Sequence, residues 1–77
     1  MEVQVLLFGR LTELTGQHTL RIGNVADTDA VRKQLMATYP ELAQLRYQIA
    51  VNQSIIHGNA PLSDGMTVAL MPPFSGG

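Results

Sequence analysis

Residues 67–77 read Thr-Val-Ala-Leu-Met-Pro-Pro-Phe-Ser-Gly-Gly. The first five form an apolar run in which Val68 and Leu70 share one face, because successive side chains of a strand point to opposite sides. This alternation predicts a strand over residues 67–71. The strand leads directly into two prolines and a run that ends in two glycines, so the strand and the tail that follows it are interpreted together.

The predicted tail begins where the prolines stop the strand. Pro72 and Pro73 hold φ at about −65° and lack a backbone N–H, so ordinary strand pairing ends there. Two terminal residues without Cβ atoms can enter a slot too narrow for any side chain, and an enzyme can approach their carbonyls closely. We expect a domain over residues 1–71 and an extended tail over 72–77, with the carboxylate of Gly77 as its reactive group. The alternative is a frayed end without function, which is common at chain termini.

The sheet is predicted from period-two alternation of apolar residues. Residues 2–8 begin with Val3, Val5 and Leu7 on one face, which we expect to point into the core. A second alternating segment follows closely and indicates a hairpin with the first, of uncertain register. Whether the last strand lies in the centre, parallel to the first, is left open by the pattern. Strands are expected over residues 2–8, 17–22, 49–52, 54–56 and 67–71.

One main helix is predicted between the second and third strands. Asp27 is a good helix N-cap, and Pro40 ends the pattern after about residue 38. Val31, Leu35 and Tyr39 form a narrow apolar stripe that is expected to pack on the sheet. A helix segregated on one face of a mixed sheet is an α+β arrangement. Short helical turns are expected over residues 10–15 and 41–46.

The composition allows one small domain and excludes several classes of function. The chain has 77 residues, of which 45% are hydrophobic, enough for a single core. A net charge of −1 offers no basic surface for nucleic acid or an anionic membrane. The early apolar run is too short for a signal peptide or a bilayer span, so we expect a cytoplasmic location. The absence of cysteine excludes disulfides, side-chain thiolates and cysteine-bound zinc.

No internal catalytic or metal site is evident. His18 alternates with Leu20 and Ile22 in the segment 17–22 and is predicted to be a packed or half-buried strand residue. His57 precedes a Gly-Asn pair and is predicted to be a solvated loop residue. Two distant histidines without neighbouring carboxylates do not make a metal site, and the serines lack an evident base. This pattern favours a carrier or a binding module over an enzyme.

Large apolar residues are predicted on the face of the sheet away from the helix. Phe8 and Met71 fall opposite the core-facing residues of their strands, and one of Ile55 and Ile56 must also point outward. An open face of a small sheet is expected to be mostly polar, so large apolar groups there indicate a partner surface. The alternative is that they are ordinary scattered surface residues.

Short motifs along nearly the whole chain match one family. A Gly-Gly end alone is shared by all ubiquitin-like carriers, whereas Pro-Pro-x-Ser/Thr-Gly-Gly combined with Val-Asn-Gln is much more specific. The chain thereby resembles the small, sulfur-carrying subunit of molybdopterin synthase, which has a ubiquitin-like β-grasp fold. Thr12 stands where relatives often carry arginine, and Met71 where an aromatic residue is common. The matching motifs are Leu7-Phe8, Glu13-Leu14-x-Gly16, Val51-Asn52-Gln53, Pro61-Leu62-x-Asp64-Gly65, Val68-Ala69 and Pro72-Pro73-x-Ser75-Gly76-Gly77.

The resemblance implies a mechanism in molybdenum cofactor biosynthesis. A ubiquitin-activating-type adenylyltransferase would use ATP to adenylate Gly77, and sulfur would then replace one oxygen to give a thiocarboxylate. The tail would insert into the large catalytic subunit, within a heterotetramer, and its sulfur would attack the pterin precursor. The chain would be no enzyme on its own and would hold no cofactor or metal. The implied tail-insertion residues are Pro72, Pro73, Phe74, Ser75 and Gly76, and the implied partner-interface residues are Phe8, Ile55 and Met71.

Two other functions remain open at this point. A sister carrier would supply sulfur to thiazole or to another acceptor, although the Pro-Pro segment argues against it. A ubiquitin-like protein modifier joined to lysines, or an interaction module with an inert tail, would belong to a different class.

Overall fold

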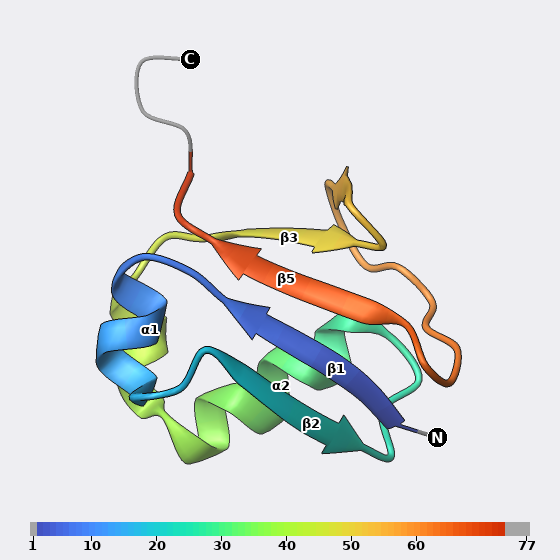
Figure 1. Ribbon diagram of the computed structural model, residues 1–77, viewed down its shortest axis with the longest axis horizontal. Coiled ribbons are helices and arrows are strands. Elements are labelled where there is room, and N and C mark those ends of the chain that lie inside the picture. The colour runs from blue at the N-terminus through green and yellow to red at the C-terminus, as the bar shows by residue number, and fades with distance from the viewer. Residues whose placement is uncertain (1, 74–77) are drawn as a thin grey trace.

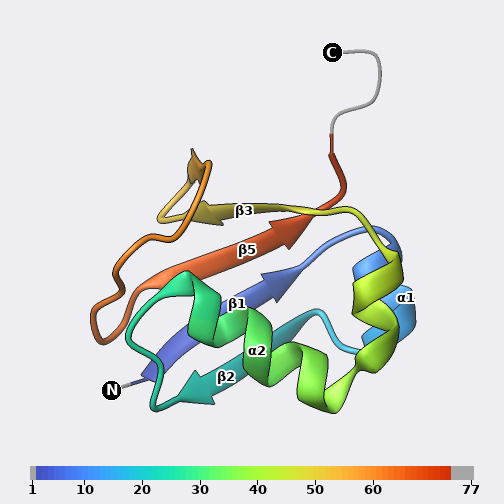
Figure 2. The same ribbon diagram turned by 180° about the vertical axis from the view of Figure 1, so that it is seen from behind.

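Five strands form one mixed sheet, and the main helix lies across one face of it (Figures 1 and 2). The computed structural model describes residues 2–73, so the tail positions 74–77, including Gly77 with its predicted reactive carboxylate, lie outside the described residues. In chain order the elements are β1 (Glu2–Leu7), α1 (Arg10–Thr15), β2 (Thr19–Gly23), α2 (Thr28–Thr38), the 3₁₀ helix η1 (Pro40–Gln44), β3 (Gln48–Val51), β4 (Ser54–Ile56) and β5 (Thr67–Met71).

The last strand lies in the middle of the sheet. The strand order is β2-β1-β5-β3-β4. The pairing of β5 with β1 is parallel, whereas β1 with β2, β3 with β5 and β3 with β4 are antiparallel pairs. The predicted first hairpin is therefore present, with Val5 opposite Leu20. The central place of β5, which the pattern left open, puts the strand that leads to the tail beside the first strand (Figure 1).

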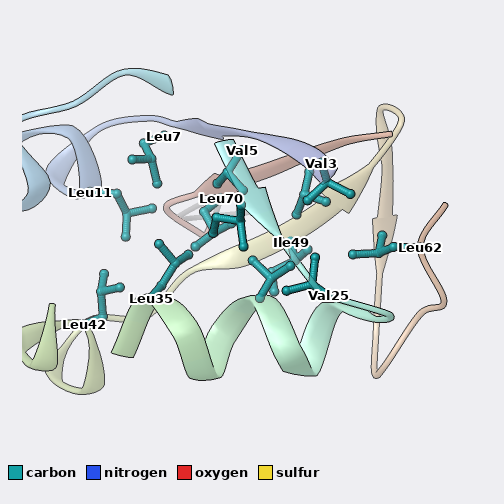
Figure 3. Packing of buried hydrophobic residues seen from close by; sticks show 13 residues of the cluster. Val3, Val5, Leu7, Leu11, Val25, Leu35, Leu42, Ile49, Leu62 and Leu70 are labelled. Atoms are coloured by element: carbon teal, nitrogen blue, oxygen red, sulfur yellow. The ribbon is translucent and has the colours of Figure 1, made fainter. Parts of the chain in front are cut away.

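The core fills the space between the inner face of the sheet and α2 (Figure 3). The residues predicted to point inward from the first and last strands are buried, as are Val31 and Leu35 of the helix. Tyr39 is half-buried and caps the helix through its N–H, which donates to the carbonyl of Leu35 at 2.7 Å. Connecting segments and short helices close the ends of the core with residues that the alternation did not mark: Leu11, Val25, Leu42 and Leu62.

The N-terminus of α2 is tied to the loop before β5. Asp27 caps the helix as predicted, because its Oδ1 accepts a hydrogen bond from the Ala30 N–H at 2.9 Å. Asn59 donates to Oδ2 of Asp27 at 3.1 Å, and its own Oδ1 accepts from the Asp29 N–H at 2.9 Å. The Ala30 N–H and the Asn59 amide hold the pKa of Asp27 below its ordinary value, because both stabilise the ionised carboxylate.

Some predicted boundaries and one burial prediction were wrong. The strand predicted over residues 17–22 begins at Thr19, and His18 before it is exposed, not packed or half-buried. Gly16 ends α1 in a left-handed conformation, and the Gln17 N–H donates to the hydroxyl of Thr15 at 3.2 Å, so the chain is still turning there. His57 is exposed, as predicted.

The third strand also ends one residue earlier than predicted. It spans Gln48–Val51, because Asn52 and Gln53 adopt positive φ values of 47° and 74° in the turn to β4. Within residues 2–73 there is no group of three or more His, Asp or Glu side chains placed to hold a metal ion. In the same part of the chain, no helix has the length and apolar character needed to cross a bilayer.

Candidate docking face and tail base

The face of the sheet away from α2 carries a row of apolar residues across four strands. Ala69 of β5 lies opposite Leu6 of β1 on one side and Ala50 of β3 on the other. Ala50 in turn lies opposite Ile55 of β4. The two alanines are flanked by larger residues, so the middle of this face is lower than its sides.

A second row lies one step nearer to the tail. Phe8 follows β1 and its N–H donates to the carbonyl of Leu70 at 3.1 Å, so it continues the line of β1 beside the end of β5. Met71 lies opposite Gln48 of β3. The Oε1 atom of Gln48 is buried and has no hydrogen-bond partner among the described residues. The end of β5 is therefore flanked by the apolar Phe8 on one side and by the polar Gln48 on the other.

The three predicted interface residues share this face. Phe8 is 47% exposed and Ile55 42%, which is unusual for large apolar side chains, and Met71 is half-buried. Of the isoleucine pair, Ile55 points outward and Ile56 packs against the core. The predicted placement is confirmed, whereas the role of these residues in binding a partner stays a prediction.

These residues line one groove, which we call the outer groove. Its volume is about 750 Å³, and none of the residues that line it is charged. The end away from the tail is polar, where Asn52 and Thr67 exchange hydrogen bonds of 2.8 and 3.1 Å. The end towards the tail is apolar. The outer groove is lined by Gln4, Leu6, Phe8, Ala50, Asn52, Gln53, Ile55, Thr67, Ala69 and Met71.

The base of the tail packs against the turn after β1. Pro72 and Pro73 follow β5 directly and are exposed. Gly9 has φ 60° and ψ −134°, and a Cβ atom placed on it would lie 2.6 Å from Cγ of Pro72. Only a residue without a side chain allows this approach. The hydroxyl of Thr12, the position where relatives often carry arginine, donates to the carbonyl of Leu7 at 2.8 Å and closes the same turn.

Sequence reasoning missed part of this site. The alternation placed Leu6 on the outer face, but nothing singled it out as a groove residue. Ala50 and Ala69 carry no strong signal, because they form the floor of the groove only through the pairing of β3 with β5. Gly9 was interpreted only as the end of a strand. A glycine at a strand end that also precedes a helix is a signal that could have identified it, since such turns often need positive φ.

The sheet order with its crossing helix defines the ubiquitin-like β-grasp class, as the resemblance implied. Within that class, the chain belongs to the ThiS family, which it matches over residues 5–77. The chain is similar to the molybdopterin synthase sulfur carrier subunit of Mycobacterium tuberculosis. The two are 35% identical over an alignment of 82 positions, which covers 100% of this chain and 99% of that protein.

Solved structures agree with this assignment. The chain is similar to a chain in the protein-protein complex of subunits 1 and 2 of the molybdopterin-converting factor from Helicobacter pylori, with 30% identity, a TM-score of 0.76 and full coverage of both chains. It is also similar to the small archaeal modifier protein 1 of Methanosarcina acetivorans, with 25% identity and a TM-score of 0.85, covering 99% of this chain and 96% of that one. The fold is thus shared by a subunit of the molybdopterin-converting factor and by a protein that is named as a modifier.

Proposed function

We propose that this chain is the sulfur carrier subunit of molybdopterin synthase. The observation that carries the proposal is the meeting of two features at the end of β5. The uncharged outer groove, with Phe8 and Met71 at its apolar end, adjoins the prolines from which the tail starts. A partner that covers the groove would therefore receive the residues after Pro73 at its own edge. The full-length relative of that name and the matching chain of the two-subunit complex support the same role.

The proposed chemistry takes place at the carboxylate of Gly77. An adenylyltransferase of the ubiquitin-activating type joins this carboxylate to AMP and releases pyrophosphate from ATP. Hydrosulfide released by a sulfur donor then attacks the acyl carbon, AMP leaves, and a thiocarboxylate results. This thiocarboxylate is a nucleophile that needs no cysteine, which suits a chain without one. Its sulfur displaces an oxygen substituent from a carbon of the pterin precursor, so that a C–O bond breaks as the C–S bond forms, and water then cleaves the acyl–sulfur bond to restore the carboxylate.

The partners of this scheme divide the work. The large subunit covers the outer groove, takes up Pro72 to Gly77 and carries out the chemistry on the pterin, so the small chain is not an enzyme on its own. The activating enzyme consumes ATP, and the carrier needs no bound cofactor or metal. Two copies of each subunit form the heterotetramer. We place these steps in the cytoplasm, where ATP is available to the activating enzyme.

The proposal is tested by intact mass after incubation with an activating enzyme, ATP and a sulfur donor. We expect a mass increase equal to the exchange of one oxygen for sulfur. A chain that lacks Gly77 is the matched control, and it should keep its melting temperature but show no shift. A wild-type chain that stays unchanged with several competent activating enzymes would refute the carrier role, as would sulfur delivery by the truncated chain.

Conjugation to other proteins is the second candidate, because one similar structure is a small archaeal modifier protein. The same activated Gly77 would then be transferred to lysine amines. The relative and the two-subunit complex named above favour the synthase subunit. Covalent ladders on added proteins would identify a modifier. Growth of a strain that lacks its own sulfur carrier for molybdopterin, but not of one that lacks the thiazole carrier, would identify the acceptor.

A further inference from the structure

We propose that Gly9 is a positioning residue for the tail, because the ring of Pro72 packs on its bare backbone and sets the direction in which the tail leaves the sheet. This inference rests on the proposed function, since the direction matters only if residue 77 must reach an active site. Gly9 itself need not touch ATP, the sulfur donor or the pterin. It acts through Pro72.

The contact is specific to this glycine. A Cβ atom on Gly9 would lie 2.6 Å from Cγ of Pro72, which is closer than real Cβ atoms come to their neighbours, and 3.2 Å from Cδ, which is tighter than most real contacts. Gly16, Gly58 and Gly65 also have positive φ values, but a Cβ on any of them would meet no described atom within 4 Å. Among these four glycines of the described part of the chain, Gly9 alone has both a backbone conformation and a close approach that require glycine.

Both sides of the contact are held by the sheet and by α1. The carbonyl of Gly9 accepts a hydrogen bond from the Thr12 N–H at 3.0 Å, which is the first turn of α1. On the other side, Met71 is paired with Gln48, so Pro72 starts from a residue fixed in the sheet. The proline ring adds its own restriction on φ. The direction of the chain at Pro72 is therefore set by packing on a rigid platform.

A small change of this direction has a large effect at the end of the tail. Five residues of any chain span at most ~17 Å, and for a tail of that full length a tilt of about 10° at the base displaces the last carbon by about 3 Å. A misplacement of about 1 Å is enough to slow an enzymatic step strongly. A methyl group on Gly9 cannot coexist with the observed position of the Pro72 ring, so the ring or the turn at Gly9 must shift, and either shift changes the direction of the chain at Pro72.

The test compares four variants with the wild-type chain in the thiocarboxylation reaction, with the activating enzyme held constant. In Gly9→Ala we expect kcat to fall about tenfold, because the tail is misdirected. KM for the carrier should change less than about twofold, because the outer groove is untouched. Gly16→Ala is the matched control, since it places a methyl group at a similar φ of 72° with no atom nearby. It should lower the melting temperature but leave kcat unchanged.

Pro72→Ala removes the two ring atoms that face Gly9, and it completes a double-mutant cycle. If the contact transmits the effect, Gly9→Ala combined with Pro72→Ala should be no slower than Pro72→Ala alone. Independent losses that multiply in the double variant would overturn the proposal, and so would a kcat of Gly9→Ala equal to that of Gly16→Ala. If Gly9→Ala does not fold, Pro72→Ala decides, because full kcat in that variant would show that the ring does not direct the tail.

The wild-type chain separates this inference from the proposed function. If the wild type gains no sulfur, the carrier role fails, and the contact is then tested by nuclear Overhauser effects between the α protons of Gly9 and the ring protons of Pro72. Their absence would overturn the positioning role. If the wild type gains sulfur and the variants match it, only the positioning role fails.

Discussion

The two faces of β5 differ although they belong to the same five residues. Val68 and Leu70 point to the inner face and have no exposed surface, whereas Ala69 and Met71 point to the outer groove. α2 covers the inner face, and no described element covers the outer one (Figure 2). Period-two alternation therefore lets one central strand supply both the core and a surface for a partner. Burial of the inner set drives folding, whereas the outer set is only half-buried and would be covered by the partner proposed above.

The largest expected contrast is in the free energy of unfolding of two neighbouring variants. Leu70→Ala should lower it by about 2–5 kcal/mol, because it leaves a cavity in the core, and this is a large part of the stability of so small a domain. Met71→Ala should lower it by about 1 kcal/mol or less, because the side chain is half-buried on the open face. Urea denaturation measures both. Equal losses would show that the two faces do not differ in the way described.

The next contrast concerns affinity for the large subunit. Phe8→Glu and Ile55→Glu should each weaken binding by at least about tenfold, because a carboxylate would be buried in an apolar contact. Met36→Glu is the matched control, since Met36 is 39% exposed but belongs to α2, on the opposite side of the sheet. Calorimetric titration gives the dissociation constants, and melting curves check the fold. Weakening by Met36→Glu to the same extent would contradict the assignment of the outer groove.

A smaller effect is expected at the helix that covers the inner face. Asn59→Ala removes the amide that joins Asp27 to the Asp29 N–H, so α2 loses its link to the loop before β5. The free energy of unfolding should fall by about 1–2 kcal/mol. The exposed Gln44 provides the control, because its substitution by alanine also removes a side-chain amide. That substitution should change the free energy of unfolding by about 0.5 kcal/mol or less. An unchanged Asn59→Ala protein would show that the helix cap is sufficient without the loop.

The smallest effect is a pH dependence at Asp27. Its folded-state pKa is lowered, first by the hydrogen bond from the Ala30 N–H and then by that from Asn59. The ionised carboxylate therefore adds stability above its unfolded pKa of about 3.9, and this contribution is lost as the pH falls through the folded pKa. The difference in unfolding free energy between wild type and Asp27→Asn should shrink between pH 6 and pH 3. A difference that stays constant across this range would exclude the linkage.

Local patterns were sufficient for most of the fold. The N-cap at Asp27, the stop at Pro40 and the apolar stripe predicted α2, because the signals of a helix lie within a few residues of one another. Alternation predicted which residues of β1 and β5 are buried, for the same reason. The predicted burial of His18 was wrong, because the alternating pattern in the sequence extends beyond the strand, and His18 lies before β2 begins. The motifs identified the family, and the outer positions of Phe8 and Ile55 followed from the pattern.

Features made by residues distant in the chain needed the folded structure. Pairing of β5 between β1 and β3 cannot be derived from the residues of β5, because hydrogen bonds between backbones carry little sequence information. The alanine floor of the outer groove depends on that pairing. The packing of Pro72 on Gly9 joins positions 63 residues apart, and neither residue alone predicts the contact. Local order follows from the chemistry of neighbouring residues, whereas the site follows from the long-range contacts that bring the first and the last strand together.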